Sequence, residues 1–75
     1  MSVKEFIETY CDDAQKFEFH YLNGLRQEDV ASTDKGKNDA LELLEYLGLE
    51  DNEISGIKTI SYGEEDFMII RLSNY

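Results

Sequence analysis

The first residues of the chain have the polar and apolar pattern of an amphipathic helix. Ser2 and Glu5 match a capping box, in which each side chain satisfies a backbone amide of the other residue. Apolar side chains then recur three or four positions apart, the spacing of one helical face. The pattern predicts a helix over about residues 3–15, with its apolar face formed by Val3, Phe6, Ile7, Tyr10 and Ala14.

Residues 16–22 change to an alternating pattern. Phe17, Phe19 and Tyr21 alternate with Glu18 and His20, which is the period of a half-buried strand. The same aromatic residues also continue the helical face of the preceding segment, so a longer helix is the alternative. Aromatic residues are enriched in strands, and we therefore favour a strand that ends at the Asn-Gly pair that follows.

Residues 24–33 show little periodicity and are predicted to be a connection. A second helix follows to about residue 47, with Thr33 or Asp34 as its N-cap. Gly36 is unfavourable in a first helical turn, so the start could shift toward residue 38. Gly48 suits the left-handed position after a helix, where Leu49 can pack back on the last turn.

The last third of the chain has two β-rich runs, residues 57–62 and 67–72, around Gly63-Glu64-Glu65-Asp66. This is the pattern of a β-hairpin, and we expect Tyr62 opposite Phe67 and Ile60 opposite Ile69. Both faces of the hairpin then carry apolar residues, and two helices can cover only one of them. The two sets are Ile60, Tyr62, Phe67 and Ile69 on one face, and Ile57, Met68, Ile70 and Leu72 on the other.

Together these elements predict one α+β domain over residues 1–75. The expected order is α-β-α-β-β, with two helices packed on a short antiparallel sheet that ends in a C-terminal hairpin. A domain of 75 residues buries a limited share of its surface, so its stability is expected to be modest.

Charge is distributed unevenly along this chain. The formal net charge is −10, and residues 1–37 hold eight acids and five bases, whereas residues 38–75 hold nine acids and only Lys58 and Arg71. A protein of this charge repels nucleic acid and anionic membranes, and its long-range field attracts basic proteins. We therefore expect no direct contact with nucleic acid or membrane, and a basic protein as the partner.

The segment from Asp51 to Tyr62 begins like a calcium loop. Asp51, Glu53, Ser55 and Gly56 occupy the first, third, fifth and sixth positions of an EF-hand. The twelfth position should supply a bidentate Glu, but here it is Tyr62. A polar loop between helix and strand is the preferred interpretation, and no metal site or cofactor is expected.

Nucleophilic catalysis has little support in the residue types present. Cys11 is the single cysteine, its neighbours Asp12 and Asp13 disfavour a thiolate, and the single histidine, His20, is expected at a strand surface. Signature serine, glycine-rich and zinc motifs are absent. We expect a protein without enzymatic activity.

Location follows from the start of the chain and from its cysteine content. The N-terminus has neither a long apolar run nor a small-residue cleavage site, and no apolar run reaches the length of a membrane span. A single cysteine suits a reducing compartment. The expectation is a cytoplasmic protein, located in the host cytoplasm if a phage encodes it.

The acidic residues themselves are the candidate binding site. Carboxylates three positions apart on the second helix rise about 4.5 Å per step and can approximate the charge row of DNA. Such carboxylates can meet arginine and lysine of a nucleic-acid-binding protein or nuclease, with an aromatic residue as anchor. The predicted contacts are Asp39, Glu42, Glu45, Tyr46, Glu50, Asp51, Glu53, Glu64, Glu65 and Asp66.

In size, charge and architecture the chain resembles the small acidic inhibitors that phages use against host nucleases, including anti-CRISPR proteins. That resemblance implies stoichiometric blockade of a basic surface. An immunity protein or antitoxin for a basic toxin is the second hypothesis, because it uses the same physics. The third is a structural or regulatory homodimer that associates through the second face of the sheet.

Overall fold

A computed structural model describes residues 1–73 of the chain, which form two helices and a four-stranded sheet. The α+β class, both helices, the strand over residues 16–22 and the C-terminal hairpin are confirmed. In chain order the elements are α1 (Val3–Tyr10), β1 (Lys16–Leu22), β2 (Glu28–Thr33), α2 (Lys37–Leu47), β3 (Ile54–Tyr62) and β4 (Glu65–Leu72).

The observed order α-β-β-α-β-β contains one strand more than predicted. β2 occupies most of the segment that was expected to be a connection, and it pairs with β1 from Phe17 opposite Thr33 to Leu22 opposite Glu28. Only Thr33 of β2 is buried, so this edge strand lacks the alternating apolar residues that would reveal it in the sequence. Backbone pairing with β1 defines β2 instead.

The sheet is mixed, and the prediction of an entirely antiparallel sheet is wrong. Its order is β2-β1-β4-β3, with antiparallel hairpins at both sides and a parallel pair, β1 and β4, in the centre. Phe17 lies opposite Met68 and Phe19 opposite Ile70. The two most apolar strands are therefore adjacent.

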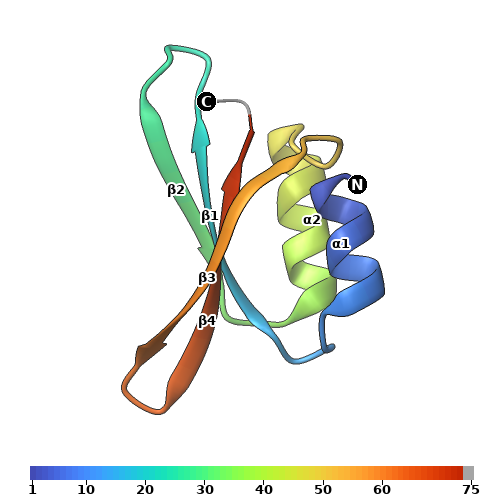
Figure 1. The fold of residues 1–75 in the computed structure, drawn as a ribbon, viewed down its shortest axis with the longest axis vertical. Helices are drawn as coiled ribbons and strands as arrows, with labels where there is room; N and C mark the ends of the chain where they lie inside the picture. The colour runs from blue at the N-terminus through green and yellow to red at the C-terminus, as the bar shows by residue number, and fades with distance from the viewer. Residues whose placement is uncertain (74–75) are drawn as a thin grey trace.

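Both helices cover the same face of this sheet (Figure 1). The core between them is formed by Val3 and Ile7 of α1, Ala40 and Leu44 of α2, and aromatic and aliphatic side chains of β1 and β4. Complete burial of an aliphatic or aromatic side chain contributes about 1.5–3 kcal/mol. The fully buried sheet residues are Phe17, Phe19, Ile70 and Leu72.

Helix α1 has the predicted capping box but is shorter than expected. The Ser2 hydroxyl accepts from the Glu5 amide, and the Glu5 carboxylate accepts from the Ser2 amide. The helix ends at Tyr10 rather than near residue 15, because Cys11 is extended (φ −104°, ψ 147°). The chain then turns at Asp12 and enters β1, so the apolar residues beyond the turn belong to the sheet.

Helix α2 starts later than its predicted N-cap. The N-cap is Gly36, with φ +103° and no side-chain capping bond, and Thr33 instead lies buried at the end of β2. The predicted helix end is confirmed. Gly48 is left-handed (φ 70°), the Leu49 amide donates to the Leu44 carbonyl at 2.9 Å, and both leucines belong to the core.

The C-terminal hairpin has a two-residue turn at Gly63 and Glu64. Tyr62 therefore lies opposite Glu65, and Ile60 opposite Phe67, so the predicted pairs are displaced by two residues. A shift of two residues leaves every side chain on its predicted face. Ile70 and Leu72 therefore face the helices, as part of the core.

Neither described helix is long and apolar enough to cross a membrane.

Candidate acidic interface

A groove between α1 and α2 brings three of the predicted contact residues together. It has a volume of about 220 Å³ and is lined by Lys4, Leu41, Glu42, Glu45 and Glu50. Glu42 and Glu45 are exposed and lie three positions apart on α2, which makes them neighbours on its surface. The groove lining therefore combines one leucine, three carboxylates and one lysine.

Backbone bonds hold the third carboxylate beside the helices. The left-handed turn at Gly48 redirects the chain toward α1, where the Lys4 amide donates to the Glu50 carbonyl at 3.3 Å. The Val3 amide donates to the Asn52 carbonyl at 2.8 Å. These bonds attach the loop after α2 to the first turn of α1, so Glu50 is positioned by backbone contacts rather than by its side chain.

The carboxylate of Glu50 has unused hydrogen-bonding capacity. Its Oε2 atom is buried and has no hydrogen-bond partner within residues 1–73. A buried carboxylate oxygen without a partner is costly, and an incoming donor would remove that cost. Asp51, the next residue, is exposed and extends the acidic surface beyond the groove.

Two other predicted contacts are engaged within the protein. The Thr33 hydroxyl donates to Asp39 Oδ2 at 2.5 Å and thereby joins the end of β2 to the first turn of α2. Glu53 lies 3.0 Å from the N-terminal ammonium group. Both carboxylates have a structural partner that a binding protein would have to displace.

The acidic hairpin turn lies apart from the groove. The turn between β3 and β4 is at the lower left of Figure 1, whereas the loop between α2 and β3 is at the upper right. Lys16 Nζ lies 2.9 Å from Glu65 Oε1, and the Ser61 hydroxyl donates to Asp66 Oδ1 at 2.6 Å. The groove and the hairpin turn are therefore two separate acidic regions, and the predicted residues do not form one surface.

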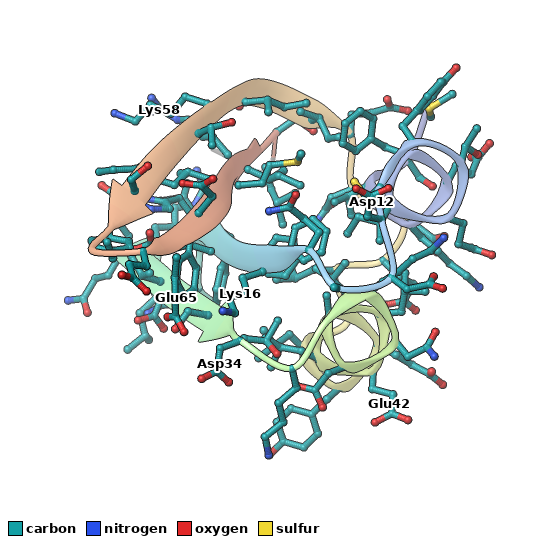
Figure 2. The ribbon with its side chains drawn as sticks, turned by 90° about the horizontal axis from the view of Figure 1, so that it is seen from below. Asp12, Lys16, Asp34, Glu42, Lys58 and Glu65 are labelled. Carbon is teal, nitrogen blue, oxygen red and sulfur yellow. The ribbon has the colours of Figure 1, made fainter. Side chains whose placement is uncertain are left out.

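Tyr46, the predicted aromatic anchor, is 87% exposed. It lies one helical turn after Glu42, so the two side chains are neighbours on the outer surface of α2. Figure 2 shows Glu42 on the side of α2 that points away from the sheet. An exposed aromatic ring beside a carboxylate can contact both the aliphatic stem and the charged end of an arginine.

Cys11 and His20 lie on opposite sides of the sheet. Cys11 Sγ is 4.0 Å from Met68 Sδ on the helix side, and His20 alternates with the buried aromatic residues of β1. Burial raises the pKa of the Cys11 thiol, nearby Lys37 lowers it by less, and Asp12 raises it further. The thiol is protonated at neutral pH, and the two residues cannot act as a nucleophile and base.

The imidazole of His20 sits between two carboxylates on the open side of the sheet. Its Nε2 atom is 3.6 Å from Glu18 Oε1, and its Nδ1 atom is 3.4 Å from Glu28 Oε1. No group of three or more His, Cys, Asp or Glu side chains within residues 1–73 is arranged to hold a metal ion.

Sequence reasoning did not predict the role of Lys4 or the internal partners of four acids. The position of Lys4 in the groove could not be predicted from local sequence, because it depends on how the two helices pack. The chain matches no family model, no curated protein and no solved structure. Its function is therefore inferred from its own residues and their geometry.

Proposed function

We propose that this protein is a small acidic inhibitor that binds a basic, nucleic-acid-binding surface of a partner protein and blocks it stoichiometrically. The groove between α1 and α2 is the primary contact. Its target class is a nuclease or another nucleic-acid-binding protein, and its mode of action is that of a phage-type, anti-CRISPR-like inhibitor that mimics DNA charge.

The observation that carries this proposal is the convergence of Glu42, Glu45 and Glu50 on one groove. Within residues 1–73 none of these three carboxylates has a hydrogen-bond or ion-pair partner, in contrast to Asp39, Glu53, Glu65 and Asp66. Carboxylates that need not break an internal bond can accept arginine or lysine at lower cost.

The shape of the groove supports recognition of a long basic side chain. The aliphatic stem of an arginine or lysine can contact Leu41, while its charged end reaches the surrounding carboxylates. The unpartnered oxygen of Glu50 supplies an acceptor there. Tyr46 adds an exposed aromatic contact on the adjacent surface of α2.

A matched pair of charge-reversal variants tests this assignment. E42K/E45K/E50K reverses the groove, and E64K/E65K/D66K makes the same change in charge at the hairpin turn. Both are assayed for binding to a panel of purified nucleases, with competition by duplex DNA at low and moderate salt. The groove variant should lose at least about tenfold in affinity, and the turn variant should lose much less.

Salt provides the second readout. Binding through carboxylates should weaken as ionic strength rises, because screening reduces both steering and contact energy. Binding that is insensitive to salt and to the groove variant would exclude this surface. Equal losses for both variants would show that net charge, rather than the groove, determines binding.

A further inference from the structure

Neither helix covers the face of the sheet opposite α1 and α2, which we call the open face (Figure 1), and its composition is unlike that of the rest of the surface. Alternation along the strands and the pairing register place fourteen side chains and Gly56 on it. Six are apolar: Leu22, Val30, Ile60, Tyr62, Phe67 and Ile69. Ile60 is 36% exposed and Val30 is 49% exposed, so this apolar surface is accessible.

Formal charges on this open face cancel. It holds three acids and three bases, whereas the whole chain has a net charge of −10. Lys58 and Arg71, the two bases of residues 38–75, both lie here. Figure 2 shows Lys58 on the far side of the molecule from Glu42 of α2. The excess negative charge therefore belongs to the remaining surface.

The charges on the open face are also separated from side to side. Lys16 and Glu65 form an ion pair at 2.9 Å that joins the two halves of the face. By formal charge the β1–β2 half is −1, from Lys16, Glu18 and Glu28, and the β3–β4 half is +1, from Lys58, Glu65 and Arg71. One half of the face is acidic and the other half is basic.

We propose that the open face binds a second copy of this chain in a symmetric, face-to-face dimer. Sheets that pack face to face keep their strands within about 30° of each other. A two-fold axis parallel to the strands lays the β3–β4 half of one copy over the β2–β1 half of its partner. The basic half of each copy then meets the acidic half of the other, twice per dimer.

Other arrangements use these charges less well. A two-fold axis across the strands, within the plane of the interface, places the basic half of one copy over the basic half of its partner. A strongly basic protein gains little from a neutral face, because the acidic groove lies on the opposite layer. The proposed dimer also directs both helix layers outward, so the two acidic surfaces point away from each other.

Charge-reversal variants test the pairing of halves. K58E and E28K each remove the charge difference between the halves, and K35E makes the same change in net charge as K58E at an exposed loop position. Sedimentation velocity of the full chain across the micromolar range measures self-association. We expect K58E and E28K each to weaken it at least about tenfold, and K35E to leave it nearly unchanged.

Mixing the variants gives the decisive result. An equimolar mixture of K58E and E28K should associate more tightly than either variant alone, because the unaltered acidic half of one meets the unaltered basic half of the other. A wild-type chain that stays monomeric would overturn the proposal. Weakening by K35E equal to that by K58E, or a mixture no tighter than its components, would also overturn it.

Circular dichroism of each variant distinguishes a lost interface from a lost fold. I60E places a charge at a partly exposed apolar position of the open face and so tests the apolar contacts of the same surface. The dimer and the acidic groove occupy opposite layers. K58E should therefore leave nuclease binding intact, and E42K/E45K/E50K should leave self-association intact, so either proposal can fail without the other.

Discussion

The two faces of the sheet differ in burial although they share the same strands. On the helix side Phe17, Phe19 and Ile70 are fully buried, whereas on the open side Ile60 and Tyr62 remain exposed. Alternating side chains of one strand therefore contribute either to the core or to an accessible surface. The hydrophobic core of this protein is built on one face only.

The same division separates the charges. Glu42, Glu45 and Glu50 surround a groove in the helix layer, whereas the open face is formally neutral. A net charge of −10 does not describe either surface well. We therefore propose different partners for the two surfaces: a basic protein for the helix layer and a second copy of the chain for the open face.

The largest expected difference between the faces is in core packing. Phe19→Ala should lower the free energy of unfolding by about 3–5 kcal/mol, because it leaves a cavity beneath the helices. Phe67→Ala, on the open face, should cost about 1 kcal/mol. Urea unfolding at low protein concentration measures both, and comparable losses would contradict the one-sided core.

A domain of this size can lose its fold entirely when a central aromatic residue is truncated. Phe19→Leu keeps most of the side-chain volume and provides a measurable variant in that case. At high protein concentration Phe67→Ala should become more costly, because the proposed dimer buries this residue. No such dependence on concentration is expected for Phe19→Leu.

Two glycines, one on each side, provide a second comparison. Gly36 has φ +103°, and a methyl group there would collide with the Asp13 carbonyl oxygen, which accepts from the Lys37 amide. Gly36→Ala should therefore destabilise by about 1–3 kcal/mol. Gly56→Ala on the open face meets Arg71 Cβ at 4.0 Å, an ordinary contact, and should change stability by less than about 0.5 kcal/mol.

Thermal unfolding of the two alanine variants gives this comparison directly. If Gly56→Ala were as destabilising as Gly36→Ala, the open face would be more tightly constrained than its geometry indicates. Self-association of Gly56→Ala is a useful addition, because its new methyl group enters a hollow on the proposed dimer surface. That hollow is lined by Gly56, Ile57, Lys58, Ile69 and Arg71.

The smallest expected effect concerns two tyrosines. Burial and then Asp29 raise the pKa of Tyr21 on the helix side. Desolvation and then Glu18, which accepts from the phenol at 3.3 Å, raise the pKa of Tyr62 on the open side. Asp29→Asn should lower the pKa of Tyr21, and Glu18→Gln should lower the pKa of Tyr62. Each variant should remove only part of the rise in pKa, because desolvation, the larger cause, remains.

Ultraviolet absorbance of tyrosinate follows these titrations, and Tyr21→Phe and Tyr62→Phe assign them. A raised pKa in the folded state means that folding favours the neutral phenol. The resulting stability is complete below the ordinary tyrosine pKa of about 10 and is lost as pH rises through the raised values. If the tyrosine titrations were unaltered in both carboxylate variants, Asp29 and Glu18 would not contribute to the raised pKa values.

Much of the fold was predictable because short-range patterns specify it. The capping box at Ser2, the alternation of residues 16–22 and the stop at Gly48 are local signals, and each predicted the observed element. Strand β2 was not predictable in this way. As an edge strand with a single buried residue, Thr33, it depends on pairing with β1.

Residue spacing along the chain was enough to assign the composition of the two sheet faces. Spacing specified which side chains of the hairpin share a side, and that assignment survived a two-residue shift in pairing because side-chain direction repeats every two residues. The sequence also specifies the excess of acids in residues 38–75.

Which residues come into contact depends on tertiary packing. It separated the hairpin turn from the end of α2, engaged Asp39 and Glu53 in internal contacts, and brought Glu50 beside Lys4. It also placed β1 beside β4, which divides the open face into an acidic and a basic half. The physical reason is that these contacts join residues far apart in sequence, so their positions depend on helix and strand packing rather than on local preference.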